Sequence, residues 1–398
     1  MTTEAELLAA VAADIDDRAT WQVYLDWLLE REDPRAALVQ LQTQLEDADD
    51  DKEKKALDKQ IGKLLEEHGK RWLAHVNRLR LPITWGMHRG VVGHVTGSPA
   101  KLAHSATAIL EAAPLLMSID LDVKLDKDRD LAPLAGSPLL ARARKLRLTG
   151  NPARVTGWEH LIAPELRALE LFMLALGPAD IEAVTALGLP ELEELSVSWC
   201  RLNKRALEPL AKLAAPRLVK LDLPAAHVGP PLGAIVARFP ALRVVRIPGN
   251  EIGSAGLAAM LPVLGNVTHL DLRGNGLVAS DLPALLDAIP NIRVLRLGAN
   301  ELGIEGPTAI ASWPRAQQLT QLDITHAGDE GARALARSEH LSLALEKLTL
   351  GYQPVSPEVE NELLDAPRIA NARIYVGMKT LGRKKRAEEL ARSAKPAR

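Results

Sequence analysis

The chain has 398 residues and a formal net charge of -2; hydrophobic residues make up 47% of it and aromatic residues only 3%. This near-neutral balance gives no long-range field to attract nucleic acid or acidic membranes, and a single cysteine excludes an intramolecular disulfide framework. No apolar run approaches the ~20 residues of a membrane span. The N-terminal stretch is acidic and lacks the basic region of a signal peptide, so we expect a cytoplasmic protein.

Residues 1–82 carry helical periodicity. Leu7, Val11 and Ile15 recur at helical spacing, and Asp33-Pro34 places a cap and a proline where a helix would begin. The apolar stripes predict five helices in this stretch, the last of them starting near Trp72. We expect a small all-helical domain, which would cover the exposed first layer of whatever follows it.

A repeated leucine-rich sequence template follows this helical stretch. Residues 267–300 contain the pattern Leu-x-x-Leu-x-Leu-x-x-Asn twice, as VTHLDLRGN and IRVLRLGAN, about 25 residues apart. The pattern recurs across residues 83–378 at spacings of about 23 to 27 residues. Its copies begin near Leu116, Ala143, Leu166, Leu192, Leu218, Leu242, Val267, Ile292, Leu319, Leu345 and Ile369. This period is typical of leucine-rich repeats, in which each unit forms one short strand and one helix.

The predicted fold is therefore α/β: a leucine-rich-repeat solenoid of about 11–12 repeats, with a curved parallel sheet inside and helices on the convex side. Residues 92–97 form a degenerate opening copy, with its helix at residues 99–113. The segment GNEIGSAGLAAMLPVL resembles the ribonuclease-inhibitor-like class, and this resemblance implies a fully helical convex side. The asparagines at the ninth template position should turn inward and hydrogen-bond the backbone; they are Asn151, Asn250, Asn275 and Asn300.

Residues 3–42 resemble the repeat-companion domain, a helical module that precedes leucine-rich repeats in many bacterial proteins. The resemblance rests on Leu7-Leu8, on WQVYLDW at residues 21–27 and on the sequence Glu-Asp-Pro-Arg at residues 32–35. Leu25 stands where the module usually has alanine. The resemblance implies a bacterial protein, and it implies no active site, because the family has no assigned chemistry.

Tryptophan is concentrated near the N-terminus, at Trp21, Trp27, Trp72 and Trp85. These side chains could anchor a partner. The alternative is that they form the core of the small helical domain, since large aromatic side chains dominate small cores. We favour the core, because Trp21 lies on the apolar stripe of its helix; Trp27 fits that stripe least well.

Cys200 occupies the ninth template position, where other repeats have asparagine. One interpretation makes it a nucleophile, as in bacterial ubiquitin-ligase effectors that carry such repeats. The favoured interpretation is that cysteine replaces asparagine in the ladder, as it does in this repeat family. A buried thiol without a neighbouring base is a small hydrophobic residue, not a reactive one.

Charged residues recur at the fifth template position, which should point away from the core. The residues at this position, two of them uncharged, are in chain order Asp120, Arg147, Glu170, Ser196, Asp222, Arg246, Asp271, Arg296, Asp323, Thr349 and Arg373. Their signs nearly alternate, so the simplest interpretation is a ladder of cross-strand pairs that neutralises the inner face. The functional interpretation is a polar surface for a protein partner, with Arg147, Glu170, Arg246 and Arg296 as contacts.

Two groups of apolar and aromatic residues are expected near the C-terminal ends of the strands. The first comprises Phe172, Met173 and Trp199, and the second His326, Tyr352 and Tyr375. Exposed aromatic and methionine side chains are what a binding hot spot uses. Partial burial under the loops that leave the strands is the competing interpretation, and the sequence does not decide between them.

No phosphate-binding glycine loop, metal-spaced His/Cys cluster or paired helical histidines occur, so we expect no cofactor, no metal and no small-molecule substrate. Residues 379–398 form a basic tail without interleaved aromatics, for which a solvated end is favoured over a nucleic-acid or lipid site. The favoured function is a non-catalytic scaffold that binds a protein. The alternatives are a GTPase-activating regulator of a small GTPase, by analogy with Ran-type activators, and a cysteine-dependent ligase.

Overall fold

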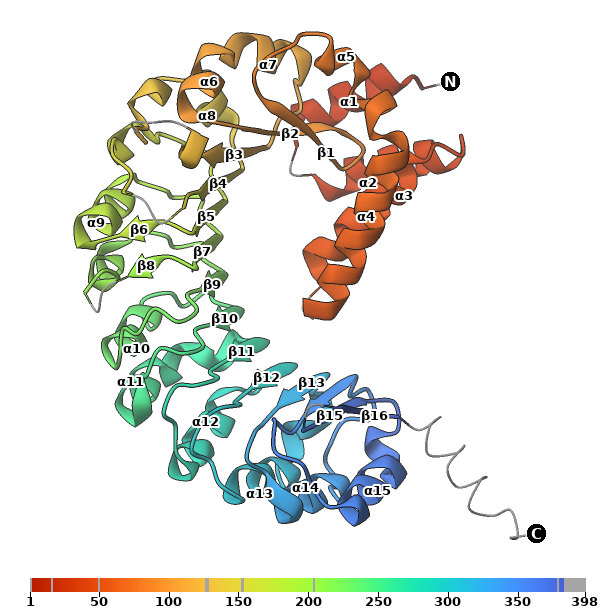
Figure 1. Cartoon of the computed structure of the whole chain (residues 1–398), viewed down its shortest axis with the longest axis vertical. Helices are drawn as coiled ribbons and strands as arrows, with labels where there is room; N and C mark the ends of the chain where they lie inside the picture. Colours follow the sequence, from red (N-terminus) through yellow and green to blue (C-terminus); the bar gives the residue numbers. More distant parts are fainter. Residues whose placement is uncertain are drawn as a thin grey trace. The chain divides into compact units, whose positions relative to one another are not determined.

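The computed structural model describes residues 2–15, 17–48, 51–125, 129–151, 154–202, 205–377 and 379–382. The chain divides into two compact units, Met1–Leu174 and Ala175–Arg398. Figure 1 labels the helices and strands of both. None of the described helices is long and apolar enough to cross a membrane. The predicted domain boundaries near residues 82 and 378 remain predictions.

The first unit begins with the five helices that the sequence predicts. They are α1 (Glu4–Ala13), α2 (Arg18–Leu29), α3 (Arg35–Asp47), α4 (Asp51–Trp72) and α5 (Ala74–Asn77). Thr3 and Glu6 form a capping box at the start of α1, and Asp17 caps α2 by accepting two backbone N–H groups. These side chains satisfy amide groups that the first helical turn leaves without partners.

Trp21 is only 4% exposed and packs in the core of the helical region, which confirms the core interpretation for this residue. The same cluster includes Val91, Leu115 and Met117, which flank or belong to the first strands of the repeats. The helices therefore cover the apolar end of the first repeat. Trp27 lies at the margin of the cluster and donates its indole N–H to the carbonyl of Thr2.

The sheet of the first unit opens with an antiparallel hairpin. β1 (Thr84–His88) pairs with β2 (Val91–Gly97), and β3 (Ser118–Asp122), β4 (Lys145–Thr149) and β5 (Ala168–Phe172) then follow in parallel. β2 confirms the predicted opening copy, and α6 (Pro99–His104) with α7 (Ala106–Ala112) occupies its predicted helical segment. β1 was not predicted, because residues 84–88 contain no copy of the template.

The connections of the first unit are less helical than the resemblance implied. After β3 come η1 (Val123–Leu125), η2 (Ala132–Leu134) and α8 (Pro138–Arg142), whereas the described residues between β4 and β5 form only the 3-10 helix η3 (Trp158–His160). Gly157, in a left-handed conformation with φ 75°, precedes η3, and Pro164 follows it closely. Both residues disfavour the extension of a helix across them.

The second unit continues the pattern of one short strand per repeat. Its main sheet runs in chain order through β7 (Glu194–Ser198), β9 (Lys220–Asp222), β10 (Val244–Arg246), β11 (His269–Asp271), β12 (Val294–Arg296), β13 (Gln321–Asp323), β14 (Lys347–Thr349) and β15 (Arg373–Val376), all parallel. β16 (Lys379–Leu381) then pairs antiparallel with β15. A small second sheet joins β6 (Ala175–Leu176) to β8 (Arg201–Leu202).

Helical segments return the chain from each strand of the second unit to the next. In order they are α9 (Pro178–Ala186), η4 (Glu208–Lys212), α10 (Pro231–Val236), α11 (Gly253–Met260), η5 (Leu261–Asn266), η6 (Ala279–Asp281), α12 (Leu282–Ala288), α13 (Glu305–Ala311), η7 (Pro314–Gln318), α14 (Gly328–Ala336), α15 (Pro357–Asp365) and η8 (Pro367–Ile369). The connection that carries η4 has no α-helix among its described residues, so full helicity again does not hold for every repeat.

The leucine positions of the template form the core of every layer. Leu270, Leu272, Leu295 and Leu297 are each at most 1% exposed, and their equivalents in other repeats are buried as well. Apolar positions four and six face the helices, and position five faces outward, as strand alternation requires. The fold is a leucine-rich-repeat solenoid.

The asparagine ladder forms as predicted in the second unit. The Asn275 side chain accepts the backbone N–H of Asn250 at 3.2 Å and donates to the carbonyl of Ile247 at 2.9 Å. Asn300 repeats this arrangement one repeat later, accepting from Asn275 and donating to the Leu272 carbonyl. Asn250, Asn275 and Asn300 are buried, so these bonds join successive turns inside the protein. Asn151 is exposed and does not belong to the buried ladder.

The predicted register of the last repeat is wrong by two residues. Thr349 of β14 pairs with Tyr375, and Lys347 pairs with Arg373. Tyr375 therefore takes the fifth template position, and Arg373 takes the third. The error arose because Ala372 was aligned with a leucine position, whereas the buried side chain in line with Leu348 is that of Ile374.

Candidate partner-binding surface

In the first unit, the outward face of the strands carries one short charge ladder. Asp120, Arg147 and Glu170 lie in register on β3, β4 and β5. The Arg147 guanidinium is 3.5 Å from the Glu170 carboxylate and 4.7 Å from the centre of the Phe172 ring. Burial raises the pKa of Asp120, and the charge of Arg147 opposes that effect. Phe172 is half-buried, and this stacked arginine covers part of it.

The ladder of the second unit is more buried than its sequence suggested. Asp271 is 4% exposed and Arg296 is 7% exposed. The Arg273 guanidinium, reaching back to Asp271 of its own repeat, bonds that carboxylate at 2.5 to 3.1 Å, and Arg296 lies 3.7 Å from it. Arg296 also donates to the Gln321 amide oxygen at 3.1 Å. The buried Arg296 therefore stabilises the face, whereas the half-buried Arg246 keeps some surface.

Asp323 completes this cluster without a close partner. Its Oδ1 atom is buried and accepts no hydrogen bond from the described residues. Burial raises the pKa of Asp323, and the nearest cation, Arg273, lies 3.9 Å from its carboxylate. A side chain at Gly298 would approach Oδ1 to 2.6 Å, so glycine at that position leaves room for the carboxylate.

A single backbone feature unites the predicted binding residues at the strand ends. The eighth template position takes a left-handed conformation in seven repeats, occupied by Met173, Trp199, Ala225, Gly249, Gly274, Ala299 and His326. Glycine is the unstrained residue for such a backbone, because the Cβ atom of an L-residue costs about 1 kcal/mol or more there. Met173, Trp199 and His326 are thus large side chains at strained positions. The sequence analysis missed this feature, although the glycines at equivalent positions were its signal.

Exposure separates these three residues from the core. Trp199 is 79% exposed and Met173 is 37% exposed, and His326 is exposed as well. A large apolar side chain that is both strained and solvent-exposed contributes nothing evident to folding. Burial under the outgoing loops, the competing interpretation, does not apply to Trp199.

The predicted second group is partly exposed. Tyr352 is 86% exposed, whereas Tyr375 is half-buried with the Lys347 ammonium 5.8 Å from its ring centre. His326 and Tyr352 occupy the turns that follow β13 and β14, and Tyr375 lies within β15. All three residues belong to adjacent repeats of the second unit.

Cys200 lies at the C-terminal side of β7, at the template position where other repeats have asparagine. Its thiol is half-buried, and Sγ lies 3.5 Å from the carbonyl of Ser198, as expected for a stand-in at the asparagine position. Among the described residues no group of three His, Cys, Asp or Glu side chains could hold a metal ion. Most of the predicted basic tail, residues 383–398, lies outside the described residues.

Together, the repeated strands, the buried leucine layers and the asparagine ladder define a leucine-rich-repeat protein. No family model matches the chain, and no curated protein matches it. The chain is similar to one in the crystal structure of the Rad7 and Elc1 complex in yeast, with 17% sequence identity and a TM-score of 0.46. That alignment covers 78% of this chain and 82% of that chain.

Proposed function

We propose that this chain is a non-catalytic scaffold that binds a protein partner through the outward face and the C-terminal ends of its strands. The observation that carries the proposal is Trp199, which is 79% exposed on a backbone with φ 56°. Exposed tryptophan is the residue type most enriched in binding hot spots. Retaining it at a strained position favours a role outside folding.

Arg246, Tyr352 and His326 supplement Trp199 in the second unit, and Arg147, Glu170, Phe172 and Met173 offer a smaller surface in the first. Arg147 stacks on Phe172, so the two side chains present one combined cationic and aromatic surface. Such pairs bind protein surfaces well, because the ring is apolar and the guanidinium supplies directed donors. Arg296 is buried and Tyr375 is half-buried, so both stabilise the outward face of the strands and offer little surface to a partner.

The finer parts of the proposal rest on sequence. We include in it a bacterial origin, a cytoplasmic location, a repeat-companion domain at the N-terminus and ribonuclease-inhibitor-like repeats. The segments GSAGLAAM in α11 and GDEGARALA in α14 support the last of these, since both form the expected α-helices. Regulation of a small GTPase and ligase chemistry through Cys200 remain predictions that no specific contact favours.

Affinity capture from the native host tests the proposal. We expect Trp199→Ala to lower recovery of a specific partner at least tenfold, with an unchanged unfolding transition. Leu343→Ala is the matched control, because Leu343 is a 63% exposed apolar residue away from the strand ends. Phe172→Ala tests the surface of the first unit separately. Equal recovery by the wild-type and Trp199→Ala proteins would remove this site from consideration.

A further inference from the structure

A pocket of about 150 Å³ lies in the first unit, between α2, α3 and the turn that joins β1 to β2. One face of α2 supplies most of its wall, because the lining residues of this helix follow the spacing i, i+3, i+4 and i+7: Arg18, Trp21, Gln22 and Leu25. Val39 lines the pocket from α3, and Arg89 lines it from the turn. At about 30 Å³ per water molecule, the pocket has room for roughly five waters or one small organic ligand.

The apolar part of the wall is held in place from behind. Trp21 is only 4% exposed, and its indole N–H donates to the carbonyl of Ile15 at 2.8 Å. Trp21 and Val39 belong to the core cluster of the helical region, and Leu25 packs against that cluster. A rigid apolar wall of this kind favours the aliphatic part of a ligand over water.

The turn that carries Arg89 is fixed as well. Gln42 of α3 donates to the carbonyl of Met87 at 2.9 Å and accepts the backbone N–H of Arg89 at 2.7 Å. The two turn residues, Arg89 and Gly90, have φ values of 47° and 80°. Asparagine or glycine is the usual residue at the first of these positions, since a Cβ atom is strained there. Retaining arginine on this backbone favours a role for its side chain outside folding.

The described residues of the wall carry two guanidinium groups and no carboxylate. The guanidinium carbon of Arg89 lies 5.5 Å from the centre of the Trp21 ring, and Arg18 precedes Trp21 by one helical turn. Asp17, next to Arg18 in the chain, accepts the N–H groups at the start of α2 and does not line the pocket. A guanidinium has five N–H donors, so it can serve a ligand alongside contacts within the protein.

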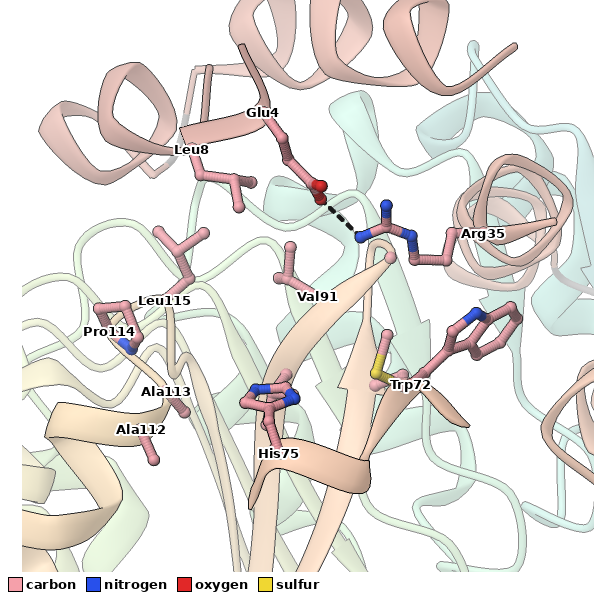
Figure 2. A pocket seen from close by; sticks show the side chains of 13 residues that line it. Glu4, Leu8, Arg35, Trp72, His75, Val91, Ala112, Ala113, Pro114 and Leu115 are labelled. Carbon is pink, nitrogen blue, oxygen red and sulfur yellow. Dashed lines mark hydrogen bonds and ion pairs between the residues drawn. The ribbon is translucent and has the colours of Figure 1, made fainter. Parts of the chain in front are cut away.

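The larger pocket of the same unit, shown in Figure 2, differs in this respect. Its arginine, Arg35, donates to Glu4 at 2.5 Å and to Asp33 at 2.8 Å. Carboxylates of the protein therefore neutralise that guanidinium, and the larger pocket gives no reason to expect an anion.

We propose that the pocket between α2, α3 and the β1–β2 turn binds a small aliphatic carboxylate. Arg18 and Arg89 would donate to the carboxylate oxygens, and the aliphatic body would pack on Trp21, Leu25 and Val39. The planar guanidinium matches the geometry of a carboxylate, whereas a phosphate would gain nothing from the apolar wall. A free monocarboxylic acid and the C-terminus of a peptide that ends in a small aliphatic residue share this chemistry. The inference does not depend on the proposed scaffold function.

Three probes test the proposal on the full chain: isovalerate, its uncharged amide and inorganic phosphate. Binding is followed through the indole N–H resonance of Trp21 and the Nε–H resonances of Arg18 and Arg89 in ¹H–¹⁵N spectra. We expect isovalerate to shift these resonances to saturation, and the amide and phosphate to bind about tenfold more weakly, because each lacks one of the two interactions. Equal binding of the amide or of phosphate, or no saturable shift with isovalerate, would overturn the assignment.

N-acetyl-alanyl-valine distinguishes the two sources of the carboxylate. Tighter binding of this peptide than of isovalerate would indicate a peptide C-terminus, and weaker binding would indicate a free acid. Either result is read only after isovalerate has bound better than its amide.

Arg89→Gly separates binding from stability. Glycine relieves the strained backbone and removes the guanidinium, so we expect an equal or higher thermal midpoint together with a loss of isovalerate affinity on the order of tenfold. Arg80→Gly is the matched control, since Arg80 also has a positive φ, 52°, is exposed and does not line the pocket. It should bind isovalerate as the wild type does. Unchanged affinity in the Arg89→Gly protein would contradict the proposal.

Arg18→Gln tests the second cation. Arg18 is exposed, so we expect the fold to persist and the affinity for isovalerate to fall by about fivefold. Full affinity in this variant would show that the two arginines do not share one ligand.

Discussion

The side-chain oxygen of Asn300 accepts the backbone N–H of Asn275 at 2.9 Å, while the Asn275 side-chain oxygen accepts the N–H of Asn250. Each amide thus serves the turn of the preceding repeat. Asn275→Ala would leave the N–H groups of Asn250 and Ile252 without this acceptor in a buried region, whereas the Ile247 carbonyl would still accept from the Asn250 side chain. At about 1–3 kcal/mol per orphaned group, we expect a loss of about 3 kcal/mol in the free energy of unfolding, measured in urea by circular dichroism.

Cys200→Ala is the control for this prediction. It removes a thiol that donates to the Ser198 carbonyl at 3.5 Å, at the equivalent template position. We expect it to cost less than about 1 kcal/mol, because a weak S–H donor contributes little. Comparable losses in the two variants would mean that the ladder does not depend on the amide group.

The left-handed conformation of the eighth template position predicts that exchanges of glycine and alanine there change stability in opposite directions. Ala299→Gly relieves an alanine at φ 56°, whereas Gly274→Ala introduces a side chain at φ 62°. A Cβ at Gly274 would meet its neighbours at 3.6 Å, an ordinary contact, so only the backbone is strained. We expect Gly274→Ala to destabilise by about 1 kcal/mol and Ala299→Gly to be neutral or slightly stabilising. Thermal unfolding of both variants against the wild type is the measurement, and a loss in both would refute the assigned conformation.

Asp271 and Asp323 lie near the same arginines, but we expect their substitution by asparagine to have different effects on stability. Asp271→Asn would leave the buried Arg296 without its nearby carboxylate, and we expect a loss of about 3 kcal/mol at pH 7. Asp323 is different, because burial raises its pKa above the ordinary value of an aspartate. Its charge therefore opposes folding above the folded pKa, and this penalty disappears as the pH falls below the unfolded value.

We accordingly expect Asp323→Asn to change stability at pH 7 by less than about 1 kcal/mol, in either direction, since the removed charge is offset by the loss of Arg273's distant partner. Urea midpoints of the two variants at pH 7 provide the comparison. A larger loss from Asp323→Asn than from Asp271→Asn would show that Asp323 is the principal partner.

Two histidines of the first unit, His88 and His94, predict its acid sensitivity, and burial lowers the pKa of His88 to about 3. Burial, aided by Lys145 and Arg147, lowers the pKa of His94 from 6.5 to about 4. The unfolded chain therefore binds a proton that the folded chain does not, and stability present above pH 6.5 is lost as the pH falls toward 4. At 1.36 kcal/mol per unit, the loss is on the order of 3 kcal/mol.

We expect His94→Gln to reduce the change in thermal midpoint between pH 7 and pH 4.5, with the contribution of His88 remaining. Gln can keep contacts with Ser118 and Thr96, whose hydroxyls lie 3.0 Å from the imidazole nitrogens. His75→Gln is the control, because His75 is exposed. A pH profile that is the same in the wild-type and His94→Gln proteins would exclude His94 as the source of the slope.

The sequence predicted the repeats well because the buried leucines and the ladder asparagines are local and periodic. It failed where periodicity ends. β1 was missed because its pairing with β2 depends on a turn at Arg89-Gly90 that the template does not encode. The register at Tyr375 was wrong because Ala372 and Ile374 both suit a leucine position, and only pairing with Leu348 decides between them.

The candidate site was predictable in composition but not in exposure. Arg296 alternates in sign with its neighbours just as Arg246 does, yet Arg296 is buried beside Gln321. Burial here depends on side chains of the adjacent strands, which no single repeat specifies. Trp199 was correctly placed at the eighth position, but its left-handed backbone became visible only with the neighbouring turns in three dimensions.

The ladder also bears on how such a chain can grow. Asn250, Asn275 and Asn300 are spaced at equal intervals of 25 residues, and the side chains of Asn275 and Asn300 each hydrogen-bond the backbone of the preceding repeat. A duplicated segment of that length would bring its own amide and its own receiving carbonyls, so tandem duplication could lengthen the array without redesigning either flank. The gain or loss of a whole repeat during evolution would therefore preserve the hydrogen bonds of the asparagine ladder.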